Sequence, residues 1–291
     1  MASHVKIGLW NTGLNPPGKK KQHAKKVMDD FCNIVDFLLN DCELDFLALL
    51  EVSVADYDVL RKKLGVGFNI IDASNSAGVN LYFDMVFVYR DGVFDFVDKF
   101  DLTKIYEGRT YKSAQQLNFI LNDLLVHFFV SHWPSRIYAK PDDGARERIA
   151  ETIANTIDRD IKGDASLVIL MGDYNAEPFE RCIQGSLSAS RDFSLVEGNS
   201  KLFYNPFWRY FSYNKSGGVN GSYFYKNGWG ARWMMYDQII FSSAFVSGSS
   251  GLVVDDDSVC IFNHALIDAA YDRHGGKLFD HYPVLAVIKG K

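Results

Sequence analysis

Residues 167–175 read Leu167-Val168-Ile169-Leu170-Met171-Gly172-Asp173-Tyr174-Asn175. A short, continuous apolar run that stops at Gly and polar residues is typical of a strand buried on both faces. Ligands of open α/β sheets bind in the crevice outside the strand ends. This stretch therefore predicts an α/β fold in which Asp173 and Asn175 lie at a ligand-binding edge.

Other apolar runs also end at side chains that can bind a metal ion or a phosphate. The runs and the polar residues at their ends are residues 5–10 with Asn11, residues 44–50 with Glu51, residues 124–130 with His132, and Phe279 with Asp280 and His281. If these runs are strands of one sheet system, their ends gather carboxylates, amides and imidazoles at one mouth. Such a mouth indicates an enzyme, and its acid content indicates a metal enzyme.

The segments between these runs alternate between helical and strand patterns. Residues 27–39 and 146–162 carry apolar side chains at helical spacing. Residues 81–89 alternate like a strand, and we expect residues 93–100 to return as its hairpin partner after Asp91-Gly92. Asp255 to Asp257 is expected to be a solvated turn. Because no Pro- or Ser-rich linker interrupts the chain, we expect residues 1–291 to form a single domain.

Composition excludes several classes of protein. The 291 residues are 47% hydrophobic, which suffices for a large core, and no apolar run reaches the 18 or so residues of a membrane span. The first strand begins near His4 without room for a signal peptide, so a cytoplasmic location is expected. The four cysteines have no CxxC spacing and are expected to be reduced.

The acidic residues at the strand ends predict a divalent cation. Glu51, Asp173 and Asp280 cannot all ionise side by side without one, because nearby like charges raise one another's pKa. Carboxylates with Asn and water suit magnesium or manganese rather than zinc, and no HExxH or Cys/His spacing is present. A hard divalent ion held by few protein oxygens usually shares its coordination with a phosphate, so phosphoester chemistry is the leading expectation.

Six blocks in this order resemble the signature of the endonuclease/exonuclease/phosphatase superfamily, which includes deoxyribonuclease I, exonuclease III, sphingomyelinases and inositol polyphosphate 5-phosphatases. The blocks are Trp10-Asn11, Leu49-Leu50-Glu51, Ser131-His132-Trp133-Pro134-Ser135-Arg136, Gly172-Asp173-Tyr174-Asn175-Ala176-Glu177-Pro178, Tyr236-Asp237-Gln238-Ile239-Ile240 and Asp280-His281-Tyr282-Pro283-Val284. They span almost the whole chain. The resemblance implies a four-layer α/β sandwich of two packed mixed β-sheets flanked by helices.

The resemblance also implies a metal-assisted, in-line attack of water on a phosphodiester, with Mg²⁺ or Mn²⁺ as the cofactor. On the metal side, Glu51 is the principal ligand, Asn11 lies beside it, and Asp280 holds a metal or its water. Asp173 orients and deprotonates the water, and the amide of Asn175 holds the phosphate or the water.

Two histidines take the remaining implied roles. His281, aligned by Asp237, interacts with the phosphate oxygens. His132, with Asp84 as its partner, acts on the leaving-group side. Taken singly, Asn11 could be a turn residue, Asp173 and Asn175 could cap a turn, and His281 could be a core histidine. Their joint occurrence at successive strand ends favours the catalytic interpretation.

The segment from Gly198 to Tyr236 is the best indication of a substrate. The chain carries a formal net charge of −5, which argues against a dedicated nucleic-acid-binding protein. This segment, however, has no acidic residue, is rich in aromatic residues, and contains the cations Lys201, Arg209, Lys215, Lys226 and Arg232. Aromatic faces with cations are typical of a platform for single-stranded or distorted nucleic acid, although many of these rings are expected to pack in the core.

Three residues are predicted to contact the substrate: Trp233 in this segment, and Arg136 and Arg146 after the His132 block. The expected activity is therefore a metal-dependent nuclease, with DNA or RNA and endo- or exo-cleavage left open. A phosphatase or phosphodiesterase acting on inositol phosphates, phospholipid head groups or nucleotides is the alternative. An inactive member that only binds a ligand or partner is the third possibility.

Overall fold

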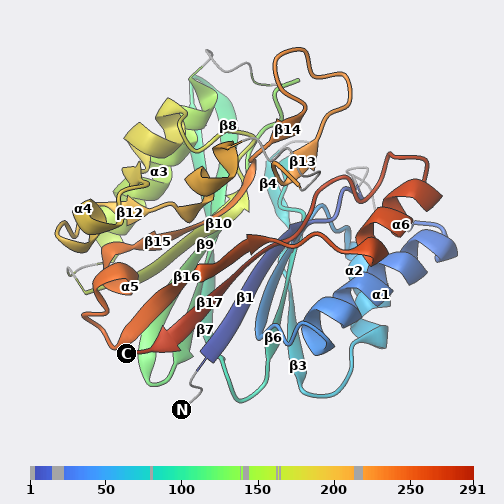
Figure 1. Ribbon diagram of the computed structural model, residues 1–291, viewed down its shortest axis with the longest axis horizontal. Helices are drawn as coiled ribbons and strands as arrows, with labels where there is room; N and C mark the ends of the chain where they lie inside the picture. The colour runs from blue at the N-terminus through green and yellow to red at the C-terminus, as the bar shows by residue number, and fades with distance from the viewer. Residues whose placement is uncertain are drawn as a thin grey trace.

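Two mixed β-sheets packed face to face form the centre of the molecule (Figure 1). The computed structural model describes residues 4–14, 23–78, 81–137, 139, 144–161, 163, 165–212 and 219–291. Lys215 and Tyr213, which belong to the acid-free segment, lie outside these residues. Within them, no helix is long and apolar enough to cross a membrane.

Among the described residues, the first sheet has six strands, in which one parallel pair joins two antiparallel sections. Its strands, in spatial order, are β16 (Leu252–Ile261), β17 (Val284–Gly290), β1 (His4–Asn11), β2 (Phe46–Leu50), β6 (Met85–Arg90) and β3 (Phe68–Asp72). The parallel pair is β1 and β2, with Asn11 opposite Leu50. Asn11 and Glu51 therefore leave the sheet at the same end.

The second sheet has seven strands in the described part of the chain. Their spatial order is β11 (Ala189–Ser190), β12 (Phe203–Tyr204), β15 (Asp237–Ser242), β10 (Leu167–Asp173), β9 (Leu124–His132), β8 (Arg109–Leu121) and β7 (Asp95–Tyr106). β10 pairs in parallel with β9 and antiparallel with β15, so Asp173 lies opposite both His132 and Asp237. One register thus places three of the predicted site residues side by side.

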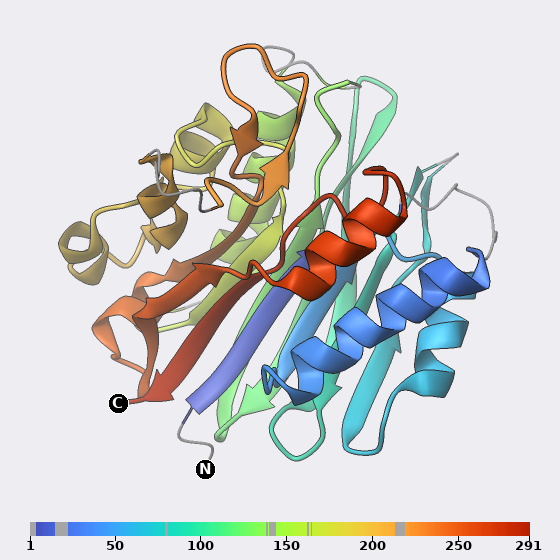
Figure 2. The same ribbon diagram turned by 45° about the vertical axis from the view of Figure 1, so that its right-hand side comes forward.

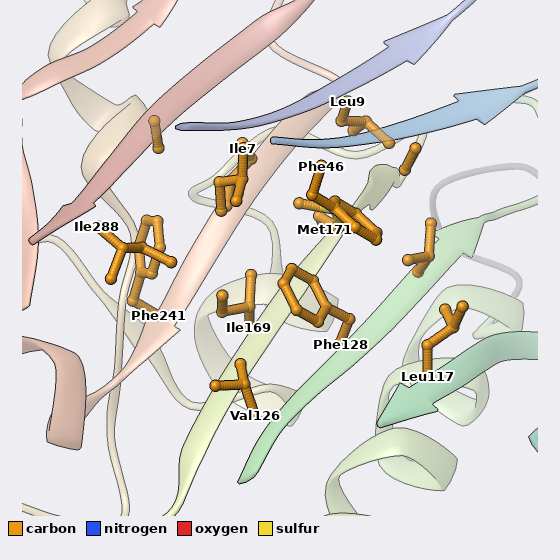
Figure 3. Packing of buried hydrophobic residues seen from close by; sticks show 14 of the residues in the cluster. Ile7, Leu9, Phe46, Leu117, Val126, Phe128, Ile169, Met171, Phe241 and Ile288 are labelled. Atoms are coloured by element: carbon orange, nitrogen blue, oxygen red, sulfur yellow. The ribbon is translucent and has the colours of Figure 1, made fainter. Parts of the chain in front are cut away.

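The main core lies between the two sheets. Ile7, Leu9 and Phe46 from the first sheet face Phe128 and Met171 from the second (Figure 3). The rings of Phe46 and Phe128 stack with centroids 4.4 Å apart. Burying an apolar side chain of this size contributes roughly 1.5–3 kcal/mol to the stability of the fold. Because central strands are buried on both faces, strands of both sheets include continuous apolar runs.

Helices cover the outer faces, as Figures 1 and 2 show. Against the first sheet pack α1 (Lys25–Asn40), α2 (Val54–Lys63) and α6 (Ala265–Arg273), through a second apolar cluster. α3 (Ala145–Asp160) and the π-helical turn η1 (Cys182–Ser186) cover the second sheet. The predicted four-layer α/β sandwich is confirmed. The shorter helical segments are α4 (Phe193–Glu197), η2 (Pro206–Phe211) and α5 (Ser243–Ser247).

Two local predictions are wrong. The predicted hairpin between residues 81–89 and 93–100 does not form, because β6 is already paired on both edges, with β2 and β3. The turn at Asp91-Gly92 instead carries the chain into β7 of the other sheet, where β7 pairs with β8. Asp255 to Asp257 lie within β16, beside an irregularity in its pairing with β17, and are not a turn.

Two small antiparallel pairs lie outside the main sheets. They are β4 (Ser76–Gly78) with β5 (Leu81–Tyr82), and β13 (Tyr223–Phe224) with β14 (Trp233–Met234). The β13–β14 hairpin, orange in Figure 2, projects from the end of the molecule at which β1 and β10 terminate.

Candidate active site

The first predicted ligands meet through the amide of Asn11. Its Nδ2 donates a hydrogen bond to Asp173 Oδ2 at 2.9 Å and lies 3.4 Å from Glu51 Oε1. Asn11 is fully buried, and its Oδ1 accepts from the main-chain N–H of Gly13 at 3.1 Å. Asn11 therefore bridges an acid of the first sheet to an acid of the second, and its side chain is held on both sides.

Three residues at or beside the site have a left-handed backbone conformation. Glu51 has φ +60°, Asn175 has φ +46° and Phe279 has φ +59°. Asn tolerates this left-handed region, whereas Glu and Phe adopt it at a cost of roughly 1–3 kcal/mol each. Strain of this kind persists only where the surrounding structure fixes it, as at binding and catalytic sites.

Asp237 and His281 form a buried pair. His281 Nδ1 lies 2.7 Å from Asp237 Oδ2, and the Tyr223 ring covers the imidazole with centroids 4.6 Å apart. Burial alone would lower the pKa of His281, but the adjacent Asp237 carboxylate outweighs it and raises that pKa to about 10. Asp237 therefore favours the protonated form of the imidazole.

A second imidazole–carboxylate pair lies on another side of the site. His132 Nδ1 is 3.2 Å from Asp84 Oδ2, and its Nε2 is 3.7 Å from Glu51 Oε1. Lys112 Nζ donates to Asp84 Oδ1 at 2.8 Å. Burial would raise the pKa of Asp84, but Lys112 and His132 hold it well below its usual value. Burial would likewise lower the pKa of His132, but Asp84 raises it above its ordinary value.

Two acids of the site, Glu51 and Asp280, have raised pKa values because they are buried. Burial raises the pKa of Glu51, His132 lowers it, and Asp84 raises it again. Burial raises the pKa of Asp280, against the opposing effect of His281. Carboxylate oxygens such as these fit a hard divalent ion such as Mg²⁺ or Mn²⁺, whereas the Asn11 amide faces Glu51 with its NH2 group.

A tighter group of possible ligands has a different explanation. Among the described residues, ligand atoms of Asp173, Asp237 and His281 all lie within 4.8 Å of one another. The protonated His281 has no lone pair to offer at Nδ1, because that nitrogen is bound to Asp237. The hydrogen bond between His281 and Asp237 accounts for this group as proton and charge pairing.

These groups open onto one cleft of about 800 Å³. Predicted site residues that line it are Glu51, His132, Arg136, Asp173, Asn175, Asp280 and His281. Further lining is aromatic, from Tyr223, Tyr225, Trp229 and Tyr236, and a second cation comes from Lys277. The described cations of the acid-free segment do not line it: Arg209, for example, pairs with Asp256. That segment therefore gives the cleft its aromatic rings and not its charge.

The three predicted substrate contacts differ in position. Arg136 lines the cleft, with its guanidinium 5.1 Å from the Tyr236 ring centroid and paired with Glu180. Arg146 is 2% exposed and donates to the carbonyl oxygens of Pro134 and Ala139, so the structure favours support of the loop after His132 over contact with a substrate.

Trp233 packs within the hairpin, with its ring centroid 4.9 Å from that of Phe224 and 6.0 Å from that of Tyr282. Trp229 lines the cleft, and Trp233 does not.

Asn175 anchors the turn after β10. Its Nδ2 donates to the carbonyl of Trp133 at 3.1 Å, and its main-chain N–H donates to Asp173 Oδ1 at 2.8 Å.

Sequence reasoning missed three residues of the site. Lys112 holds Asp84 from β8, a strand that was not predicted. Gly13 allows Asp280 to approach, since a Cβ there would lie 2.4 Å from Asp280 Oδ1. Tyr223 covers His281. Gly13 stands two residues after Asn11, and Tyr223 belongs to the acid-free aromatic segment, whereas Lys112 gave no local signal.

Comparisons with known proteins agree with this architecture. The solved structures that are similar include D. rerio TDP2 complexed with a single-strand DNA product (15% identity, TM-score 0.64, 99% of this chain and 100% of that chain). The human Nocturnin catalytic domain with bound sulfate is similar at 13% identity and TM-score 0.63, over 100% and 96% of the two chains. The Bacteroides thetaiotaomicron mannosyl-6-phosphatase Bt3783 is similar at 15% identity and TM-score 0.62, over 98% and 99%.

Curated protein sequences gave no match. The model of the endonuclease/exonuclease/phosphatase family matches residues 22–287, most of the chain. Members of this family are typically hydrolases of phosphoester bonds and depend on divalent metals. This chain belongs to the endonuclease/exonuclease/phosphatase family.

Proposed function

We propose that this chain is a divalent-metal-dependent nuclease that hydrolyses phosphodiesters by in-line attack of water. One observation carries the proposal: acids from both sheets and two imidazole–carboxylate pairs converge on a single cleft. In-line displacement needs groups on opposite sides of phosphorus, and residues from two facing sheets can supply them.

Glu51 and Asp280 would hold Mg²⁺ or Mn²⁺, with Asn11 beside Glu51 at 3.4 Å. When bound, the ion neutralises phosphate charge and lowers the pKa of water. On the protein side, Asp173 accepts the proton of the attacking water, and hydrogen bonds from the Asn11 side chain and the Asn175 main chain fix its two oxygens. A carboxylate held in this way is pre-oriented for its role.

The imidazoles stabilise charge as it develops. His281 is kept protonated by Asp237, so it can donate a hydrogen bond to a phosphate oxygen whose charge grows in the transition state. His132 serves the leaving group, and Lys112 together with Asp84 holds its orientation. The side-chain amide of Asn175 holds the turn after β10, which would face the phosphate.

The aromatic cleft supports a nucleic acid as the substrate, as does the fold likeness to a protein bound to single-strand DNA product. A net charge of −5 favours the second candidate, a small phosphoester such as an inositol phosphate, a phospholipid head group or a nucleotide. A catalytically inactive member is disfavoured, because the acids and imidazoles of the site are all present.

The test is an assay of purified protein on labelled single- and double-stranded DNA, RNA and inositol phosphates, with Mg²⁺, Mn²⁺ or EDTA. We expect cleavage of nucleic acid that EDTA abolishes and that falls at least 10²-fold in Asp173→Asn. Phosphate release from small molecules alone would replace the proposal with the second candidate. Binding without turnover in any metal would support the inactive alternative.

A further inference from the structure

The tip of the β13–β14 hairpin places two rings in solvent at the rim of the cleft. The side chain of Trp229 is fully exposed, Tyr225 is 46% exposed, and both line the cleft that contains Asp173 and His281. Large apolar side chains exposed together beside a site usually mark a binding surface. The hairpin is the orange projection in Figure 2.

The base of this hairpin is fixed to the catalytic pair. The main chain of Tyr223 bridges to His281, and the N–H of Tyr282 donates to the Ser222 carbonyl at 2.7 Å. The N–H of Asp237 donates to Ser222 Oγ at 3.0 Å. The hairpin that carries Trp229 and Tyr225 is therefore attached at its base to the segments that hold Asp237 and His281.

The tip itself has a defined backbone. The N–H of Tyr225 donates to the Arg232 carbonyl at 2.7 Å, and that of Gly228 donates to the Tyr225 carbonyl at 2.9 Å. A Cβ on residue 228 would lie 2.0 Å from the Ala231 carbonyl oxygen, so the turn requires Gly there. This tight turn carries Trp229 at the tip of the hairpin.

The chemistry around Trp229 indicates stacking without hydrogen-bonded readout. Gly228, Gly230, Ala231 and Met234 of the same hairpin also line the cleft and offer no side-chain hydrogen-bond donors, whereas the donors Ser135, Arg136 and Lys277 come from other segments. A sugar or inositol ring would need polar side chains to bind its hydroxyls, whereas a nucleobase needs only a flat apolar face. Bases in a duplex are already stacked on one another, so the base that uses this face is unpaired.

We propose that Trp229, with Tyr225, stacks an unpaired nucleobase that flanks the scissile phosphate, so that the cleft selects single-stranded nucleic acid with little preference among bases. This inference rests on the nuclease proposal and specifies its substrate. It assigns to the hairpin tip a recognition role that is separate from the chemistry at Asp173 and His281.

The test compares the KM for a single-stranded oligothymidylate with that for an all-abasic oligomer of equal length and charge, in Mn²⁺. We expect wild-type protein to show a KM roughly 5- to 150-fold lower for the oligomer with bases. Trp229→Ala should lose that advantage without changing the KM for the abasic oligomer, and Trp229→Phe should keep part of it.

Phe100→Ala, which removes a half-exposed ring from β7 outside the cleft, is the control and should behave as wild type. Equal KM values for the two oligomers, or a duplex cleaved as well as the single strand, would overturn this inference alone. No cleavage of either oligomer, of duplex DNA or of RNA would overturn the nuclease proposal and the inference with it. A Trp229-dependent KM for an inositol or sugar phosphate would assign the ring to a different substrate and also overturn it.

Discussion

Replacing Gly13 by Ala should displace the Asp280 carboxylate and so reduce activity. A Cβ at residue 13 would lie 2.4 Å from Asp280 Oδ1 and 2.9 Å from the main-chain nitrogen of Phe279. The Phe279 nitrogen is fixed, because it donates to the Thr12 carbonyl at 3.2 Å. The carboxylate must therefore retreat by about 1 Å, and a misplacement of that size in an active site costs about 10²-fold in kcat/KM.

Gly92→Ala is the matched control. Gly92 has φ +74° and Gly13 has φ +59°, so Ala is strained at either position by about 1–2 kcal/mol, but a Cβ at residue 92 has nothing within 4 Å. Thermal unfolding should show both variants folded, each with a Tm lowered by a few degrees. Cleavage of labelled single-stranded DNA in Mn²⁺ should fall only in Gly13→Ala. Equal activity of the two variants would refute the claim that the position of Asp280 matters.

Three further predictions concern other parts of the site. Asp237→Asn should lower kcat/KM by about 10²- to 10⁴-fold with little loss of Tm, because His281 loses the charge that keeps it protonated; unchanged kinetics would exclude that role. Burial raises the pKa of Glu177 from 4.5 to about 7, so its contribution to stability is complete below pH 4.5 and is lost as pH rises through 7. In the wild type, the free energy of unfolding should therefore fall by up to about 3 kcal/mol between pH 4.5 and 7, and Glu177→Gln should remove this fall. Denaturant unfolding across this pH range measures it, and an identical pH profile of the two proteins would contradict the prediction. Mn²⁺ at 100 times its Kd should stabilise the wild type by about 2.7 kcal/mol in thermal unfolding but should not stabilise Glu51→Gln; equal stabilisation of both would move the metal away from Glu51.

Buried strands were readable from the sequence because they are covered on both faces. Residues 46–50 and 167–171 are continuous apolar runs, and the structure places them in β2 and β10 in the centres of the two sheets. Their polar ends could be predicted as site residues for the same reason: a buried strand can expose a functional side chain only where it stops.

The pairing between strands was harder to predict from the sequence. Residues 85–90 and 95–106 follow each other through a Gly turn, which locally favours a hairpin. The outcome depends instead on whether an edge of β6 is available, and both are occupied by strands distant in sequence. β8 escaped prediction because its polar residues, such as Gln115 and Asn118, are satisfied by side chains of other strands and so interrupt the apolar pattern.

Residue type also did not settle which cation or ring reaches the cleft. Arg136 and Arg146 both follow the His132 block, yet one lines the cleft and the other is buried against main-chain carbonyls. Trp229 and Trp233 are four residues apart, and the hairpin turns only the first into the cleft. Such differences arise from the path of the backbone between the residues, which neither composition nor spacing specifies.

Anomalous scattering from a crystal soaked in Mn²⁺ tests the central claim most directly. The account predicts a peak in contact with the carboxylates of Glu51 and Asp280, with Asp173 and His281 facing the same cleft. A peak at the Asp173, Asp237 and His281 group instead, or none near Glu51, would contradict it.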